Sequence, residues 1–408
     1  MTTRPPNVPE QLVVDYDAFG TETPEELLAK AEEWRKLGPV VWTDQNHGHW
    51  VVLGTPEVRV VLSDPRKFSS SKPGQGITLT RTERELHVPI EMDGVDHREY
   101  RKILMPLFTP ARVRVLEDQA RRISGELLDD MVKAEECDIV ADFARPLASA
   151  MFLSLVDWPL DDRHKLEVLV EQELNPPGAT REEKAAAKGE AVKQLAAYCR
   201  ERIEIRRRAP ADDMTSTILN ATLADGSPIP ENRLIPMMVL LCLAGLDTTQ
   251  SVLSRSLDYL GRNQEAQAEF RDNLDLLPTM IEELLRWNTP AVPNRTAMED
   301  FELGGVQIVA GDTVQCLLQA ANRDEDEFPD AWSTDFTRTV NRHVAFSVGP
   351  HKCIGSALAR VILNAALDEF HTRIHGYHVV DSKAHIGAVW GMNNVRMSLT
   401  TSREPATV

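Results

Sequence analysis

The chain has 408 residues, of which 42% are hydrophobic and 26% charged, so it can bury a large core and is not expected to be disordered. Its net charge of -18 argues against a general nucleic-acid-binding protein, because duplex binding depends on a basic surface. Five scattered cysteines, odd in number and without a CxxC pair, are typical of a reducing cytoplasm and not of a disulfide-stabilised protein.

The organisation of the chain predicts a single unit. The N-terminus has no apolar signal core, and the longest nearly apolar run, residues 235–246, is too short to cross a membrane. The middle of the chain contains no Gly/Ser-rich or Pro-rich linker and no internal repeat. We therefore expect a monomeric, cytoplasmic protein with one domain over residues 1–408 and flexible tails at both ends.

The first hundred residues mix helical and strand periodicity. The pattern predicts a helix over residues 27–34, strands over 40–42 and 50–53, and a short helix over 57–62. Segment 70–92 is less regular and contains Lys-Pro-Gly, which makes it a candidate loop over a binding site.

Helical periodicity then runs from residue 97 to about 208, with interruptions at 157–159 and 175–178. Its last stretch, 182–208, is predicted as one long exposed helix with a basic end. A further long helix over about 232–260 is apolar on nearly every face at its centre, which is typical of a helix through the middle of a large domain.

The C-terminal third combines helices with short strands. The predicted elements are a helix over 276–287, strands around 301–308 and 313–317, a final helix over 356–371, and a tail of strands and turns. The predicted fold class is therefore mainly α with a minor β lobe.

The strongest chemical signal is a loop that delivers Cys353 to the start of an apolar helix. The loop reads Phe-Ser-Val-Gly-Pro-His-Lys-Cys-Ile-Gly and ends at Gly355. Backbone amides and the helix dipole there favour the thiolate over the thiol, and a thiolate held in this way can ligate iron. The other cysteines lack such a loop and are expected to be buried and inert: Cys137, Cys199, Cys242 and Cys316.

This loop resembles the haem-binding signature of the cytochrome P450 family. Eight residues fall at the family's spacing: Phe346, Gly349, His351, Cys353, Gly355, Leu358, Ala359 and Arg360. Ser347 departs mildly from the pattern, since glycine is commoner there. The resemblance implies the mainly helical P450 prism fold with a small β lobe, bound haem b (iron protoporphyrin IX), and Cys353 as the axial ligand of its iron. The arrangement is similar to that of soluble bacterial terpenoid hydroxylases, such as the camphor hydroxylase.

Glu283 and Arg286 lie three residues apart on a predicted helix, so they share a face and can form an ion pair. Alone, such a pair is usually an ordinary surface contact. Here it resembles the family's Glu-x-x-Arg pair, which supports the cysteine loop from behind, and the same resemblance makes Arg338 the third member of the network.

The long apolar helix contains Ala244-Gly-Leu-Asp-Thr-Thr. Asp247 is costly there unless it has partners or a task, and Gly245 weakens the helix by about 1 kcal/mol relative to alanine. A kink capped by threonine hydroxyls is one interpretation. The segment also resembles the family's oxygen-binding groove beside the haem, formed here by Ala244 and Gly245. That resemblance makes Asp247 and Thr248 an acid–alcohol pair that guides protons to dioxygen.

Haem propionates need cationic or hydrogen-bonding anchors. His97 and Arg101 are four residues apart on one predicted helix face and match the family's His-x-x-x-Arg pair. Arg295 and His351 match further propionate ligands of the family. Taken singly, each would more often be a surface residue or a satisfied core group.

The resemblance implies a monooxygenase that inserts one atom of dioxygen into a C–H bond, while the other atom leaves as water. The chain carries no reductase, flavin or ferredoxin segment, so we expect electrons from NAD(P)H to arrive through a ferredoxin reductase and a [2Fe-2S] ferredoxin. Arg98, Lys102 and Lys352 are expected to attract that acidic ferredoxin. A peroxide-driven peroxygenase and a non-catalytic haem sensor or carrier remain alternatives, although neither needs the acid–alcohol pair.

Family analogy also suggests which residues line the substrate pocket. They are aliphatic: Ile77, Leu79, Val88, Leu243, Ala244, Ala291, Val292 and Val389. Arg81, Arg84 and His87 in the 70–92 loop leave a carboxylate anchor open. We expect a compact, largely uncharged apolar substrate, such as a terpenoid or a small alicyclic or alkyl-aromatic compound; these lining residues could equally be ordinary core.

Overall fold

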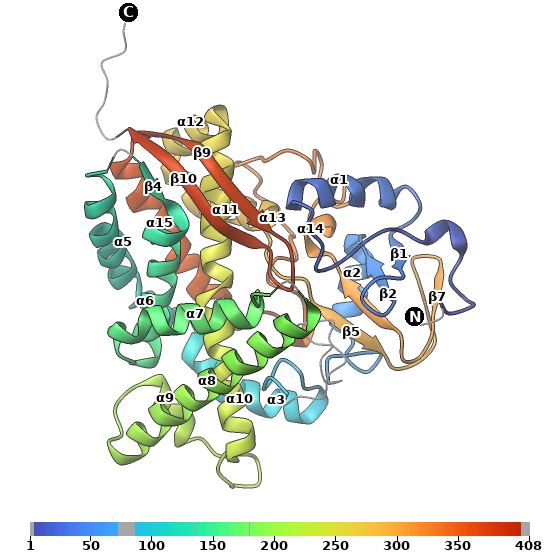
Figure 1. The fold of residues 1–408 in the computed structure, drawn as a ribbon, viewed down its shortest axis with the longest axis horizontal. Coiled ribbons are helices and arrows are strands. Elements are labelled where there is room, and N and C mark those ends of the chain that lie inside the picture. The colour runs from blue at the N-terminus through green and yellow to red at the C-terminus, as the bar shows by residue number, and fades with distance from the viewer. Residues whose placement is uncertain (1–3, 72–85, 135, 179, 401–408) are drawn as a thin grey trace, which may run out of the picture.

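The computed structural model describes residues 4–71, 86–134, 136–178 and 180–400. Helices make up most of the molecule, and strands β1, β2 and β5 gather with helices α1 and α2 at one end (Figure 1). The predicted class, mainly α with a minor β lobe, is confirmed. Ile77, Leu79, Arg81 and Arg84 of the expected substrate loop lie outside the described residues.

The first half of the chain is dominated by helices. They are α1 (Pro24–Arg35), α2 (Thr55–Ser63), α3 (Gly94–Leu104), α4 (Pro110–Arg114), α5 (Glu117–Met131), α6 (Arg145–Val156), α7 (Arg163–Leu174) and α8 (Arg181–Arg208). The second half adds α9 (Met214–Leu219), α10 (Glu231–Leu246), α11 (Thr248–Arg262), α12 (Gln264–Asp272), α13 (Leu277–Trp287), α14 (Leu318–Ala321) and α15 (Ser356–Arg373).

The strands form small sheets. A five-stranded sheet has the order β1 (Val40–Thr43), β2 (His49–Val52), β8 (Thr313–Cys316), β5 (Asn294–Ala297) and β3 (Phe68–Ser69). A three-stranded sheet joins β4 (Glu136–Asp138), β10 (Gly391–Thr400) and β9 (Gly376–His385), and β6 (Phe301–Leu303) pairs with β7 (Val306–Ile308). In the larger sheet, Arg295 lies opposite Val314, so pairing with β8 fixes its position in the interior.

Local signals in the sequence explain where the helices begin and end. Helix α8 starts one residue before the predicted stretch, after Thr180, whose hydroxyl accepts from the Glu183 amide in a capping box. Helix α6 ends at Asp157, which adopts a left-handed conformation with φ 53°. The long helix predicted over 232–260 is present but is broken at Asp247 into α10 and α11.

Two helical stretches, Ile139–Val156 and Glu231–Arg262, are long and apolar enough to cross a membrane. The most apolar part of the first stretch is 72% buried inside the molecule, and that of the second stretch is 83% buried. These are the properties of core helices, which bury apolar residues on all faces. Figure 1 accordingly shows α10 and α11 as one long column through the middle of the fold.

A fully buried ion pair ties helix α13 to the chain that precedes the cysteine loop. Arg286 Nη2 lies 2.6 Å from Glu283 Oε1, and neither side chain is exposed to solvent. Arg286 also donates to backbone carbonyls of the following segment, those of Asn322, Ala331 and Ser333. Arg338 Nε completes the group at 3.3 Å from Glu283 Oε2. The structure thus brings together the three residues that the sequence assigned to structural support.

Replacing Glu283 should destabilise this scaffold strongly. Glu283→Gln leaves the Arg286 guanidinium buried without its counter-charge, so we expect a loss of about 3–5 kcal/mol in the free energy of unfolding. Urea unfolding followed by circular dichroism measures that loss. Glu282→Gln is the matched control, because the neighbouring Glu282 is partly exposed and pairs with Arg360. Equal losses in the two variants would contradict the assigned role of Glu283.

Candidate active site

The loop that carries Cys353 has a fixed shape. The Cys353 amide donates to the carbonyl of Phe346 at a distance of 2.8 Å. Gly349 adopts φ 69°, and a Cβ at this position would lie 2.7 Å from the carbonyl oxygen of Leu62 in α2. Only glycine therefore fits where the loop packs on α2. Ser347 also has a positive φ of 59°, a conformation that favours glycine and explains why glycine is commoner there.

The sulfur of Cys353 is accessible although protein surrounds it. Cys353 is exposed, whereas the other four cysteines are buried as predicted. Burial nevertheless raises the pKa of the Cys353 thiol, and the Gly355 amide and the Arg101 guanidinium oppose that rise. A Cβ added at Gly355 would meet nothing within 4 Å except this sulfur. A thiol that is surrounded by protein but remains accessible on one side can act as a metal ligand. Coordination to a metal itself deprotonates the thiol.

Helix α10 has one exposed residue between neighbours that are buried. Ala244 is exposed although its neighbours Leu243 and Leu246 are buried in the core. Leu243 and Leu246 belong to the apolar cluster on which Ile354, the residue after Cys353, packs. An exposed alanine among buried neighbours shows that α10 is left uncovered at this residue.

Gly245 has a packing role that the sequence did not indicate. A Cβ at this position would lie 2.6 Å from the ring of Phe152 in α6, so glycine allows α10 and α6 to approach each other. The hydroxyl of Thr248 donates to the carbonyl of Ala244 at 2.8 Å. The helix break is therefore capped by a threonine hydroxyl, as in the kink interpretation, and it stands beside the exposed alanine.

Asp247 is buried in this break with part of its hydrogen-bonding capacity unused. Its Oδ1 accepts from Gln250 Nε2 at 2.8 Å, and Oδ2 has no partner among the described residues. Burial raises the pKa of Asp247 to about 6; the Gln250 hydrogen bond opposes the rise, and the nearby carboxylate of Glu171 adds to it. A carboxyl group that titrates near neutral pH can both release and accept protons.

Four cationic or potentially cationic side chains meet in the interior. The rings of His97 and His351 stack with their centroids 4.0 Å apart, and Arg101 and Arg295 lie close enough to act on both. Burial, followed by the effect of His351 and Arg101, lowers the pKa of His97 to about 3. Among the described carboxylates, Asp93 alone is within ion-pair distance of this cluster, 3.3 Å from His351.

Burial lowers the pKa of Arg101 and of Arg295, and neither has a carboxylate partner in the part of the chain that the structure describes. Buried cations normally have partners. The cluster therefore has the charge expected of a site for two carboxylates. These residues fit a haem: His97, Arg101, Arg295 and His351 would hold its propionates, and Cys353 would supply a thiolate for its iron.

The expected substrate-lining residues that are described come from two places. Ala291 and Val389 form an antiparallel bridge, and the Val292 amide donates to the carbonyl of Ala388, so these segments are adjacent. Val88 and Leu243 belong to one large apolar cluster, which also includes residues of α3, α6, α7, α8 and α9.

The sequence analysis did not identify Asp93 at the cationic cluster, nor Glu91 and Glu173 beside the expected substrate-lining residue Val88. Asp93, which holds His351 and accepts from Ser69 at 2.6 Å, could have been noticed as an Asp-Gly pair before a helix. Beside Val88, the His87 ring lies 3.4 Å from Glu173 and 3.6 Å from Glu91, and all three are buried. Glu173 comes from distant α7, so no local signal connects it with His87.

Comparison with known proteins shows the family to which the chain belongs. Residues 177–371 match the family model "Cytochrome P450". The chain is 33% identical over 356 residues to mycinamicin IV hydroxylase/epoxidase of Micromonospora griseorubida, covering 86% of this chain and 88% of that protein. It is 30% identical over 380 residues to linalool 8-monooxygenase of Pseudomonas putida, covering 89% and 92%.

Among solved structures, cytochrome P450 CYP101C1 superposes with a TM-score of 0.87 at 27% identity, over 98% of this chain and 100% of that one. The relatives share most of the chain's length, and the structural match covers the helical body together with the small sheets. From its sequence, its fold and its cysteine loop, this chain belongs to the cytochrome P450 family and is a P450 monooxygenase of the soluble bacterial class.

Proposed function

We propose that this single-domain, cytoplasmic P450 hydroxylates a compact, largely apolar substrate. Cys353 is the iron ligand, and the pair Asp247 and Thr248 delivers protons for the activation of dioxygen. Electrons pass from NAD(P)H through a ferredoxin reductase and a [2Fe-2S] ferredoxin to the monomeric enzyme. Haem, when bound, supplies the redox chemistry that activates dioxygen. The protein contributes the thiolate, the cations for the propionates, the proton donors and an apolar pocket.

One observation carries this proposal: a buried acid with a pKa of about 6 stands at a helix break next to a threonine hydroxyl and an exposed Ala244. Oxygen activation consumes protons in a site that must otherwise exclude water. A carrier or sensor of haem ligands needs no such acid, and a peroxide-driven enzyme receives its protons with the peroxide. The placement of Asp247 and Thr248 therefore favours the monooxygenase over both alternatives.

The substrate class is supported by the apolar bridge between Ala291 and Val389 and by the membership of Val88 and Leu243 in one apolar cluster. A relative named for linalool, a terpene alcohol, agrees with a terpenoid-like substrate. The buried group of His87, Glu91 and Glu173 adds hydrogen-bonding capacity beside Val88, which suits a substrate with one polar function.

The proposed ferredoxin surface is a basic patch on an acidic protein. Arg98 and Lys102 on α3 and Lys352 before Cys353 are exposed, and within residues 4–71, 86–134, 136–178 and 180–400 none has a carboxylate within ion-pair distance. Arg101 Nη2 donates to the Lys352 carbonyl at 2.8 Å, so helix α3 and the cysteine loop lie side by side. An acidic partner would thus dock close to the iron ligand.

Removing the alcohol of the pair should uncouple the enzyme. We expect Thr248→Ala to keep consuming NADH and dioxygen but to release hydrogen peroxide in place of much of the product. Thr249→Ala is the matched control, since Thr249 is the buried neighbour on the same helix. Product and peroxide formed per NADH are measured together. Unchanged coupling in Thr248→Ala would count against the acid–alcohol pair.

The carboxyl group of Asp247 should make the rate of product formation depend on pH. Because the pKa of Asp247 is raised to about 6, its protonated form is lost as pH rises through that value, and product formation should slow above it. Asp247→Asn should be slower at every pH and should lose this dependence.

Docking of the ferredoxin should depend on salt. First-electron transfer should slow several-fold as ionic strength rises, because screening weakens the attraction between exposed charges. Lys352→Glu should mimic high salt, whereas Lys383→Glu on distant β9 should not. Stopped-flow reduction under carbon monoxide measures the rate, and a rate independent of salt would be incompatible with electrostatic docking.

The substrate class can be tested by the shift of the haem from low to high spin. A panel of terpenoids, fatty acids, aromatic acids and steroids is titrated into the haem-loaded enzyme. We expect the largest shifts with neutral terpenoids or small alicyclic compounds, because the described lining residues are aliphatic. Strong shifts with charged aromatic acids and none with terpenoids would overturn this choice.

A further inference from the structure

A cleft of about 560 Å³ lies away from the residues assigned to haem and substrate. Its walls come from the start of α1, the last turns of α11, the end of α13 and the β9–β10 hairpin, elements that Figure 1 shows next to one another. Of the residues that the structure describes, none of those assigned to haem or substrate lines it. Its volume is within the range of small-molecule sites.

The cleft contains a buried arginine with free donors. Arg255 is 7% exposed, and its Nε and Nη1 have no hydrogen-bond partner among the described residues. Its nearest carboxylate is Glu25, at 3.9 Å, and that side chain is 74% exposed. Burial lowers the pKa of Arg255, and the carboxylates of Glu25 and Asp258 oppose that shift. A buried donor without a partner is rare in native proteins and calls for an explanation.

Aromatic side chains form the wall next to this guanidinium. Tyr259 and Trp287 contact each other with ring centroids 5.6 Å apart, and Trp332 also lines the cleft. Behind Trp287 lies Arg323, whose guanidinium is 4.1 Å from the ring centroid and is bonded to backbone carbonyls. Burial, together with the charges of Arg286 and Arg255, lowers the pKa of Arg323 to about 9. The guanidinium groups of Arg255 and Arg323 therefore give this side of the cleft an excess of positive charge.

The other charged side chains of the cleft limit the charge of a ligand. Arg262 pairs with Asp258 at 3.1 Å and donates to Ser382, so that pair is neutral. Glu25 stands at the entrance. A doubly charged phosphate would meet both carboxylates, whereas a single planar carboxylate matches the one guanidinium left free.

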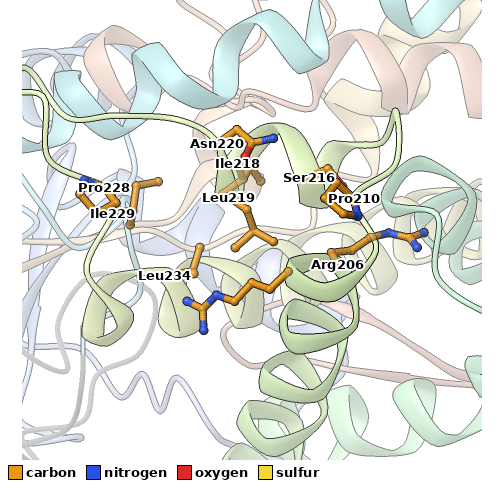
Figure 2. Close-up of a pocket in the computed structure, with 10 residues that line it drawn as sticks. Arg206, Pro210, Ser216, Ile218, Leu219, Asn220, Pro228, Ile229 and Leu234 are labelled. Carbon is orange, nitrogen blue, oxygen red and sulfur yellow. The ribbon is translucent and has the colours of Figure 1, made fainter.

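A second cavity, of about 250 Å³ between α8, α9 and α10, provides the contrast (Figure 2). Arg206 and Arg207 line it too, but both are compensated. Arg206 pairs with Asp157 and Asp213, and Arg207 lies 2.9 Å from Glu231. A cavity with arginines is thus not enough; Arg255 differs because its nearest described carboxylate, Glu25, is 3.9 Å away.

We propose that the cleft at Arg255 binds an aromatic monocarboxylate. The carboxylate pairs with the Arg255 guanidinium, and the ring packs against Tyr259 and Trp287. The site would be occupied independently of the substrate, and binding there leaves the iron untouched.

Calorimetry with the haem-loaded enzyme tests this, with 3-phenylpropionate as the probe and its neutral amide as the matched ligand. We expect the acid to bind without a shift of the Soret band and the amide to bind far more weakly. Arg255→Gln should weaken binding of the acid about ten- to a hundredfold, since it removes hydrogen bonds to a charged group. Arg262→Gln, which alters an already paired arginine, should change it less than about threefold.

Glu25→Gln should change the affinity for the acid in the opposite direction. Because Glu25 is exposed, this variant tests the proposal even if Arg255→Gln does not fold. Removing the carboxylate that competes for Arg255 should tighten binding of the acid about two- to fivefold. Unchanged or weaker binding in Glu25→Gln, binding of the amide equal to that of the acid, or a Soret shift that accompanies binding would overturn the proposal.

Discussion

The structure depends on placing an accessible cysteine inside a protein, beside the guanidinium groups of Arg101 and Arg295, which form no ion pair with a carboxylate of the described residues. Burial disfavours the charged form of Cys353, Arg101 and Arg295 alike, as the directions of their pKa shifts show. A fold that buries such groups without partners would lose stability. A cofactor that brings a metal for the sulfur and two carboxylates for the cations resolves both problems together, which is why haem fits this interior.

The rest of the fold holds that arrangement rigid. Gly349 lets the cysteine loop lie against the backbone of α2, and the Glu283–Arg286 pair fixes the chain that leads into the loop. On the opposite side, Gly245 lets α10 approach Phe152 while Asp247 interrupts the helix. Asp247 and Thr248, the proposed proton donors, therefore lie at a helix break whose surroundings are fixed by packing.

Much of this could be predicted from the sequence because the signals are local. The cysteine loop, the long apolar helix and the capped start of α8 each lie within a few tens of residues, and their bounds agree with the structure to within a few positions. The Glu283–Arg286 pair is three residues apart, so helix geometry alone brings it together.

Interactions between distant segments could not be predicted in this way. Glu173 reaches His87 from another helix, Asp93 meets His351 across the fold, and Arg255 becomes a buried free cation only because α1 and α13 close around it. The packing reason for Gly245 also depends on a partner, Phe152, that is about ninety residues away. The strand β5 was missed because four residues with a central arginine carry little strand signal.

The central claim is that Cys353, and no other cysteine, is the iron ligand. The most direct test is the Soret band of the reduced, carbon monoxide-bound protein in Cys353→Ser, compared with Cys242→Ser, which changes a buried cysteine of α10. We expect the thiolate position of the band and all turnover to be lost in Cys353→Ser and both to be kept in Cys242→Ser. A thiolate band and turnover that persist in Cys353→Ser would contradict the account.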